Sequence, residues 1–132
     1  MLLKNKTQSQ LIKEADKQFS IFIRRRDVDG SGYGKCCTCN KRINWKEGDC
    51  GHYISRSWHS VRHNEKNAAL QCKGDNGYKG GCPPEFALYL INRWGAGILE
   101  ELNRLKRNRP PQRKELIKII KHYKKLNKEY EL

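Results

Sequence analysis

The chain has 132 residues, with 28 Lys plus Arg against 14 Asp plus Glu, so its formal net charge is +14. At 36% hydrophobic and 32% charged residues it can bury only a modest core, enough for one domain, and it has no apolar run of the roughly 20 residues that a membrane-spanning helix needs. So many positive charges repel one another and favour binding to a polyanion, of which nucleic acid is the commonest. The alternative is that the chain is simply a soluble basic protein.

The first predicted element is a helix over residues 8–26. Its apolar residues recur at three- and four-residue steps and form one stripe, which is typical of a helix that packs on a core. The stripe consists of Leu11, Ala15, Phe19, Phe22 and Ile23. Three arginines end this helix, where positive charge suits the C-terminal dipole, and they could equally contact phosphate. Residues 27–34 are rich in Asp and Gly and predict a turn.

All six cysteines lie between positions 36 and 82. Cys36 and Cys39 have the C-x2-C spacing of a zinc knuckle, in which a tight turn points two thiolates at one tetrahedral metal. Cys72 and Cys82 form a second group and complete a predicted zinc site. The N-terminus lacks the apolar core of an export signal, so no export is expected and the cysteines should be reduced, which favours metal over disulfides. Buried cysteines without metal are the alternative.

The segment between the cysteine groups predicts short strands. Residues 41–53 surround a Gly-Asp turn signal with β-type residues and predict a β-hairpin that has His52 near the end of its second strand. Residues 54–67 predict a polar loop or short helix, in which His59 and His63 are interpreted as surface histidines. A short strand over 67–72 then returns to the core.

Three helices are predicted after a Gly-rich stretch. The first begins at Pro83-Pro84 and stops at Gly95, the second covers 98–107, and the third covers 112–130 after a Pro-Pro break. The last helix has a basic face whose lysines are candidate contacts to a DNA backbone, although a solvated face is the alternative. The candidate DNA-binding residues on it are Lys114, Lys118 and Lys121.

Two residue types needed for phosphodiester hydrolysis lie three positions apart. His52 offers a base whose pKa lies near working pH, and Asp49 offers a carboxylate that could hold a divalent metal. Asn67 and Asn76 follow further along the chain. With cysteine groups on both sides, this order is that of an HNH, or ββα-metal, nuclease.

The same motifs resemble the NinG (Rap) family of lambdoid phage recombination proteins over roughly residues 8–126. The motif residues are Asp49, Gly51, His52, Tyr53, Ser55, Arg56, Arg62, Asn64, Glu65, Asn67, Gln71, Cys72 and Asn76. The upstream C-x2-C pair and a downstream helix carrying Phe86, Leu90 and Gly95 also fit. The resemblance implies an α+β fold: one domain over 1–132, with a zinc-stabilised ββα-metal core (35–82) between an N-terminal helix (8–26) and a helical C-terminal part (84–132).

The resemblance also implies an endonuclease that acts on branched DNA, such as Holliday junctions and D-loops. In this reading His52 is the general base, and Asp49 and Asn76 hold a catalytic Mg²⁺ or Mn²⁺. Asn67 is the middle HNH residue and orients the loop rather than binding metal. Arg56 and Arg62 are expected to contact phosphate.

One position departs from the family pattern. Asp75 stands where the family has the fourth zinc cysteine, so either Asp75 is an oxygen ligand or Cys82 replaces the missing thiolate, and the compensating thiol of Cys82 is the preferred reading. Zinc binding that is weakened or lost is a third option.

Two other functions stay open. One is a zinc-bearing DNA-binding accessory protein without catalysis, and the other is a general HNH nuclease on duplex DNA. The pairing of Asp49 with His52 argues against the first, because a binding module has no need of it. DNA binding should weaken steeply with salt. Resolution of a four-way junction needs two symmetric cuts, which would suit a homodimer.

Overall fold

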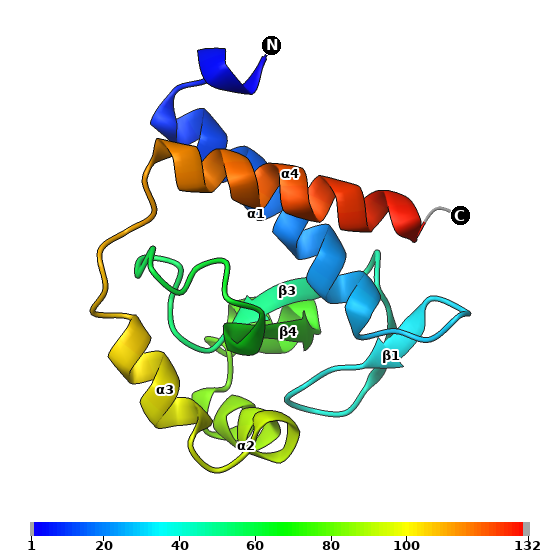
Figure 1. Cartoon of the computed structure of the whole chain (residues 1–132). Coiled ribbons are helices and arrows are strands. Elements are labelled where there is room, and N and C mark those ends of the chain that lie inside the picture. The colour runs from blue at the N-terminus through cyan, green and yellow to red at the C-terminus, as the bar shows by residue number, and fades with distance from the viewer. Residues whose placement is uncertain (1, 131–132) are drawn as a thin grey trace.

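The computed structural model describes residues 2–130 and shows helices packed around two small antiparallel sheets (Figure 1). In chain order the elements are η1 (Leu3–Asn5), α1 (Gln8–Arg26), β1 (Tyr33–Lys35), β2 (Arg42–Asn44), β3 (Asp49–His52), η2 (Glu65–Asn67), β4 (Ala68–Gln71), the π turn η3 (Gly74–Tyr78), α2 (Pro83–Trp94), α3 (Ile98–Leu105) and α4 (Arg113–Glu129). The α+β class is therefore confirmed. No helix among these residues is long and apolar enough to cross a membrane.

Helix α1 has the predicted bounds because both of its ends carry clear signals. Thr7 caps it by accepting from the backbone N–H of Gln10, and the Gln10 side chain accepts in return from the Thr7 N–H, which satisfies two free donors of the first turn. Its apolar stripe packs on α4, which lies along it in Figure 1. The C-terminal helices also form where the sequence predicts them, to within one or two residues.

The predicted β-hairpin over residues 41–53 is wrong. Strand β2 pairs with β1 through the Cys36–Cys39 turn, and β3 pairs with β4 across the long 53–67 loop. The Gly48-Asp49 signal does mark a turn, but the strands on its two sides belong to different sheets. A turn signal locates a reversal of the chain and does not identify the strand that supplies the hydrogen bonds.

Strand β4 lies at the centre of the molecule, and all four of its residues are buried. Its side chains alternate between two faces, as strand geometry requires. Ala68 packs with Phe19 and Tyr123 on the side of α1 and α4, whereas Ala69 packs with Phe86 and the other core residues of α2 and α3. Figure 1 shows the β3–β4 pair between these two helical layers. The side chains of β3 and β4 are therefore held in place by helices on both faces of the strand pair.

Candidate functional site

Three cysteines and one aspartate form a cluster that could hold a metal ion such as zinc. The ligand atoms of Cys36, Cys39, Cys72 and Asp75 all lie within 4.8 Å of one another. The Cys39 and Cys72 sulfurs are 3.9 Å apart, and the Cys36 sulfur is 3.8 Å from Asp75 Oδ2. A tetrahedral zinc with Zn–S bonds of about 2.3 Å separates its sulfurs by about 3.8 Å, so the donor set and its spacing fit that metal.

Hydrogen bonds within the cluster favour a thiolate at Cys36 and hold the Asp75 carboxylate in place. The backbone N–H of Cys72 donates to the Cys36 sulfur over 3.2 Å, and Thr38 Oγ1 donates to Asp75 Oδ2 over 2.7 Å. The hydrogen bond with Cys37, and further ones with Thr38 and Cys72, lower the pKa of the Cys36 thiol to about 4 although burial opposes this. A deprotonated thiol is the form that binds metal.

The fourth member of the cluster corrects the preferred sequence reading. Asp75 belongs to the group, whereas Cys82 lies at the start of α2 in a left-handed backbone conformation, with φ of 48°, and is not a member. The reason is local geometry. The π turn η3 brings Asp75 beside Cys72 at the same three-residue spacing that joins Cys36 to Cys39.

The other two cysteines have separate places. Cys37 is buried in the apolar cluster beside Phe86, and Cys50 lines the cleft described next. Burial raises the pKa of the Cys50 thiol to about 12, which keeps it protonated at neutral pH. Both are free thiols.

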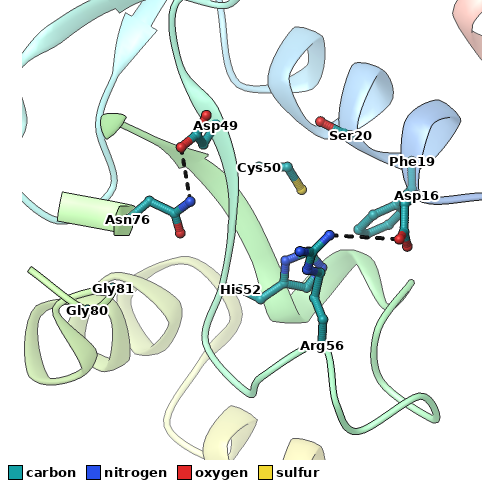
Figure 2. A pocket seen from close by; sticks show the side chains of 10 residues that line it. All are labelled: Asp16, Phe19, Ser20, Asp49, Cys50, His52, Arg56, Asn76, Gly80 and Gly81. Atoms are coloured by element: carbon teal, nitrogen blue, oxygen red, sulfur yellow. Dashed lines mark hydrogen bonds and ion pairs between the residues drawn. The ribbon is translucent and has the colours of Figure 1, made fainter. Parts of the chain in front are cut away.

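A cleft of about 490 Å³ lies between α1, β3 and the segment after β4 (Figure 2). Asp49 and His52 line it from β3, and Asn76 lines it from η3, so three of the predicted catalytic residues share one cavity. The complete lining is Asp16, Phe19, Ser20, Asp49, Cys50, His52, Arg56, Asn76, Gly80 and Gly81.

His52 is held as a neutral base. Its Nε2 lies 2.9 Å from the backbone carbonyl oxygen of Arg62. A carbonyl can only accept, so Nε2 carries the proton and Nδ1 keeps the lone pair. Burial lowers the pKa of His52 to about 4, so the imidazole is uncharged at neutral pH.

Asp49 and Asn76 form a pair of oxygen-bearing side chains on the opposite side of the cleft in Figure 2. Asn76 Nδ2 donates to Asp49 Oδ2 over 3.0 Å, and Lys73 Nζ lies 2.5 Å from Asp49 Oδ1. The β3–β4 register sets Asp49 opposite Gln71, five residues before Asn76. A carboxylate and an amide oxygen are ligand types that suit Mg²⁺ or Mn²⁺.

The glycine of the Asp-x-Gly-His motif is explained by close packing. A Cβ at Gly51 would lie 2.2 Å from Gln71 Oε1. The Gln71 amide crosses this point to donate to Thr38 Oγ1 in the knuckle and to the Gly81 carbonyl at the cleft. The metal cluster and the cleft are therefore joined through one buried side chain.

Asn67 does not line the cleft. It is fully buried, and its side chain accepts from the N–H of Ile54 and donates to the carbonyls of Ile54 and Val61. These three bonds hold the start and the middle of the 53–67 loop, whose Arg62 carbonyl fixes His52. The arrangement fits an orienting residue and not a metal ligand.

Replacement of Asn67 by alanine should lower the free energy of unfolding by about 2–4 kcal/mol, because three buried backbone groups would lose their partners. Urea unfolding of the metal-loaded protein measures this. Asn92→Ala, at an exposed position of α2, is the matched control and should change stability by less than about 0.5 kcal/mol. Equal stability of the two variants would contradict an anchoring role.

The predicted phosphate contacts have different surroundings. Arg56 is 60% exposed at the cleft, and Lys114, Lys118 and Lys121 are exposed on α4 but do not line it. The side chain of Arg62 is only 15% exposed and forms an ion pair with Asp16. It is therefore not free to contact phosphate, contrary to the prediction.

Sequence reasoning missed Asp16. It lines the cleft from α1 and accepts hydrogen bonds from both Arg62 and His63. The side chain of His63 is only 4% exposed, so His63 is not the surface histidine that the sequence predicted. Burial alone would raise the pKa of Asp16, but the hydrogen bonds and charges of Arg62 and His63 outweigh it and hold the pKa well below the usual range. An acidic residue between the buried Ala15 and Phe19 was the available signal.

Comparison with known proteins gives one consistent family. The family model described as "Bacteriophage Lambda NinG protein" matches residues 1–132. The chain is 32% identical over 98 residues to Protein ninG of Escherichia phage 933W and of Escherichia phage lambda, and 31% identical to that of Salmonella phage P22. Each alignment covers 74% of this chain and 46% of the relative, so the chain spans about half the length of the curated relatives it matches. No solved structure matches it significantly.

Proposed function

We propose that this chain, which belongs to the NinG family of bacteriophage proteins, is a metal-dependent endonuclease that cleaves branched DNA such as Holliday junctions and D-loops. The observation that carries the proposal is the shared cleft of Asp49, His52 and Asn76. It combines an oriented neutral imidazole with two oxygen donors, in a chain of net charge +14.

The proposed catalytic unit is of the HNH, or ββα-metal, type. Strands β3 and β4 are the two antiparallel strands, and η3 with α2 follows them. His52 ends the first strand, Asn67 precedes the second, and Asn76 lies in the turn after it. In this reading the cluster of Cys36, Cys39, Cys72 and Asp75 holds a structural zinc that fixes η3, and with it Asn76, against the knuckle.

His52 is proposed to remove the proton from the attacking water. Its Nδ1 is the lone-pair nitrogen, and the Nε2–H bond to the Arg62 carbonyl sets the ring's orientation. Asp49 and Asn76 would hold a divalent cation, which would stabilise charge on the phosphate and on the leaving 3′ oxygen. Arg56, exposed at the cleft, would contact a neighbouring phosphate.

The low pKa of His52 has a defined consequence. A pKa of about 4 makes the ring a weak base but keeps it unprotonated throughout the neutral range. The rate is therefore expected not to fall through protonation of His52 until the pH drops toward that value. The free enzyme needs no deprotonation of this residue before it can act.

The proposed setting is phage DNA recombination in the host cytoplasm. Two symmetric cuts in a four-way junction would require two active sites, so a homodimer on the DNA is part of the proposal. Arg56 at the cleft and the lysines of α4 supply positive charge for backbone contacts, which carry much of the affinity for DNA irrespective of sequence.

Cleavage of a labelled synthetic four-way junction, run against a linear duplex of the same arm sequence with Mg²⁺ or Mn²⁺, tests the proposal. Faster cutting of the junction supports it. Equal cutting of both substrates would replace it with a general duplex nuclease. Tight binding without cutting in either metal would replace it with a DNA-binding accessory protein.

A further inference from the structure

One carboxylate of α1, that of Asp16, binds the part of the 53–67 loop that lies behind His52. Asp16 Oδ1 accepts from Arg62 Nε over 2.8 Å and from His63 Nε2 over 2.8 Å, and Asp16 Oδ2 accepts from Arg62 Nη2 over 2.5 Å. The Arg62 pair is bidentate, which fixes orientation as well as distance. Two consecutive loop residues are thus bound to one side chain.

The residue that Asp16 binds is also the residue that orients the base. Arg62 presents its guanidinium to Asp16, its Nη1 donates to the Arg56 carbonyl, and its own carbonyl accepts from His52 Nε2. Asn67 holds the loop at Ile54 and Val61 but makes no bond to Arg62 or His63. The part of the loop that touches His52 is therefore anchored by Asp16.

We propose that Asp16 is a positioning residue for hydrolysis. Asp16 binds Arg62 and His63 and so holds the Arg62 carbonyl in the place where this carbonyl fixes the tautomer and orientation of His52. The inference rests on the proposed role of His52 as general base. It assigns Asp16 no contact with the reacting atoms.

Asp16 also balances the charge at this place. Arg56, Arg62 and His63 all face it, and Arg56 Nη1 lies 3.8 Å away (Figure 2). Loss of the carboxylate would leave the largely buried guanidinium of Arg62 without its counter-charge, and such a group moves toward water. Movement of Arg62 would carry its carbonyl away from His52.

The decisive readout is the state of the His52 ring, followed by ¹⁵N NMR of the histidine side chains in the zinc-loaded protein. Wild type should show a neutral His52 with the proton on Nε2. Asp16→Asn should shift His52 toward a mixture of tautomers. Glu14→Gln, which removes the same charge from α1 two residues away, is the matched control and should leave the His52 signals unchanged.

Single-turnover cleavage of the four-way junction gives the functional readout. Asp16→Asn should lower the cleavage rate about 10- to 100-fold, as expected when a catalytic group is displaced slightly from its reactive position. Binding of the junction should not weaken. Arg62→Lys keeps both charges but loses the bidentate fork, so it should give the same phenotype. The double variant should be no slower than either single one.

The outcomes separate the two proposals. An unchanged His52 signature in folded Asp16→Asn, or in Arg62→Lys if the first variant does not fold, would overturn the positioning role. A changed signature in a protein whose wild type cuts no DNA would leave the Asp16 anchor standing and refute the proposed nuclease function.

Discussion

Replacement of Cys72 by serine is expected to abolish binding of the knuckle metal and to unfold the centre of the molecule. The Cys72 thiol lies 3.9 Å from that of Cys39 and belongs to the four-residue cluster. Structural zinc contributes about 10–16 kcal/mol of apparent binding energy, which is of the same size as the roughly 5–15 kcal/mol of stability of an ordinary domain. Loss of one of three thiolates should therefore cost more than the fold can supply.

Zinc content by mass spectrometry and the thermal unfolding midpoint measure this effect. Cys82→Ser is the matched control, because it removes a half-buried cysteine that lies outside the cluster. It should keep one zinc per chain and a wild-type midpoint. Loss of zinc in Cys82→Ser, with zinc kept in Asp75→Ala, would show that Cys82 and not Asp75 is the fourth ligand.

Replacement of His52 by alanine should lower the single-turnover rate of DNA cleavage by a factor of about 10²–10⁴, the usual contribution of a general base. Removal of the ring leaves the Arg62 carbonyl without its donor and, in the proposed mechanism, the attacking water without a base. Binding of the junction should be unchanged, because the neutral imidazole adds no charge to the basic surface.

The control for this variant is His59→Ala, which removes an imidazole that does not line the cleft. It should cleave at the wild-type rate. Circular dichroism and zinc content establish that His52→Ala remains folded. A His52→Ala protein that is folded, binds zinc and cuts the junction as fast as wild type would contradict the role of His52.

The helices could be predicted because their signals are local. The stripe of α1, its Thr7 cap and the Pro and Gly that bound α2 act within a few residues, so the bounds of α1 are right and those of α2 nearly so. Strand pairing depends on distant segments. The sequence identified β-type residues in 41–53 but could not show that β2 pairs with β1 and β3 with β4.

The candidate site shows the same division. Asp49, His52 and Asn76 were predicted from motif order, and the β3–β4 register brings them to one cleft. The structure groups Asp75, and not Cys82, with the three cysteines, whereas the preferred reading gave a thiol more weight than the three-residue spacing of a tight turn. Spacing within a turn was the better guide, since a short turn fixes where its ends point.

The partners of Asp16 could not be predicted, although its place between buried residues of α1 was a signal. Its partners Arg62 and His63 are 46 and 47 residues away in the sequence, and neither forms a motif with it. Arg62 could be a phosphate contact or a buried ion pair as far as the sequence shows, and only the packing of α1 against the loop decides between them.

The most direct test of a hydrolytic centre in the cleft is the divalent-metal dependence of junction cleavage by zinc-loaded protein. Wild type should cut only with added Mg²⁺ or Mn²⁺ and should reach saturation. Asp49→Asn should need at least about 10-fold more Mn²⁺ or fail to cut, whereas Glu47→Gln, an exposed neighbour, should match wild type. Cleavage by Asp49→Asn with the metal dependence of wild type, or cleavage without added divalent metal, would contradict the assignment.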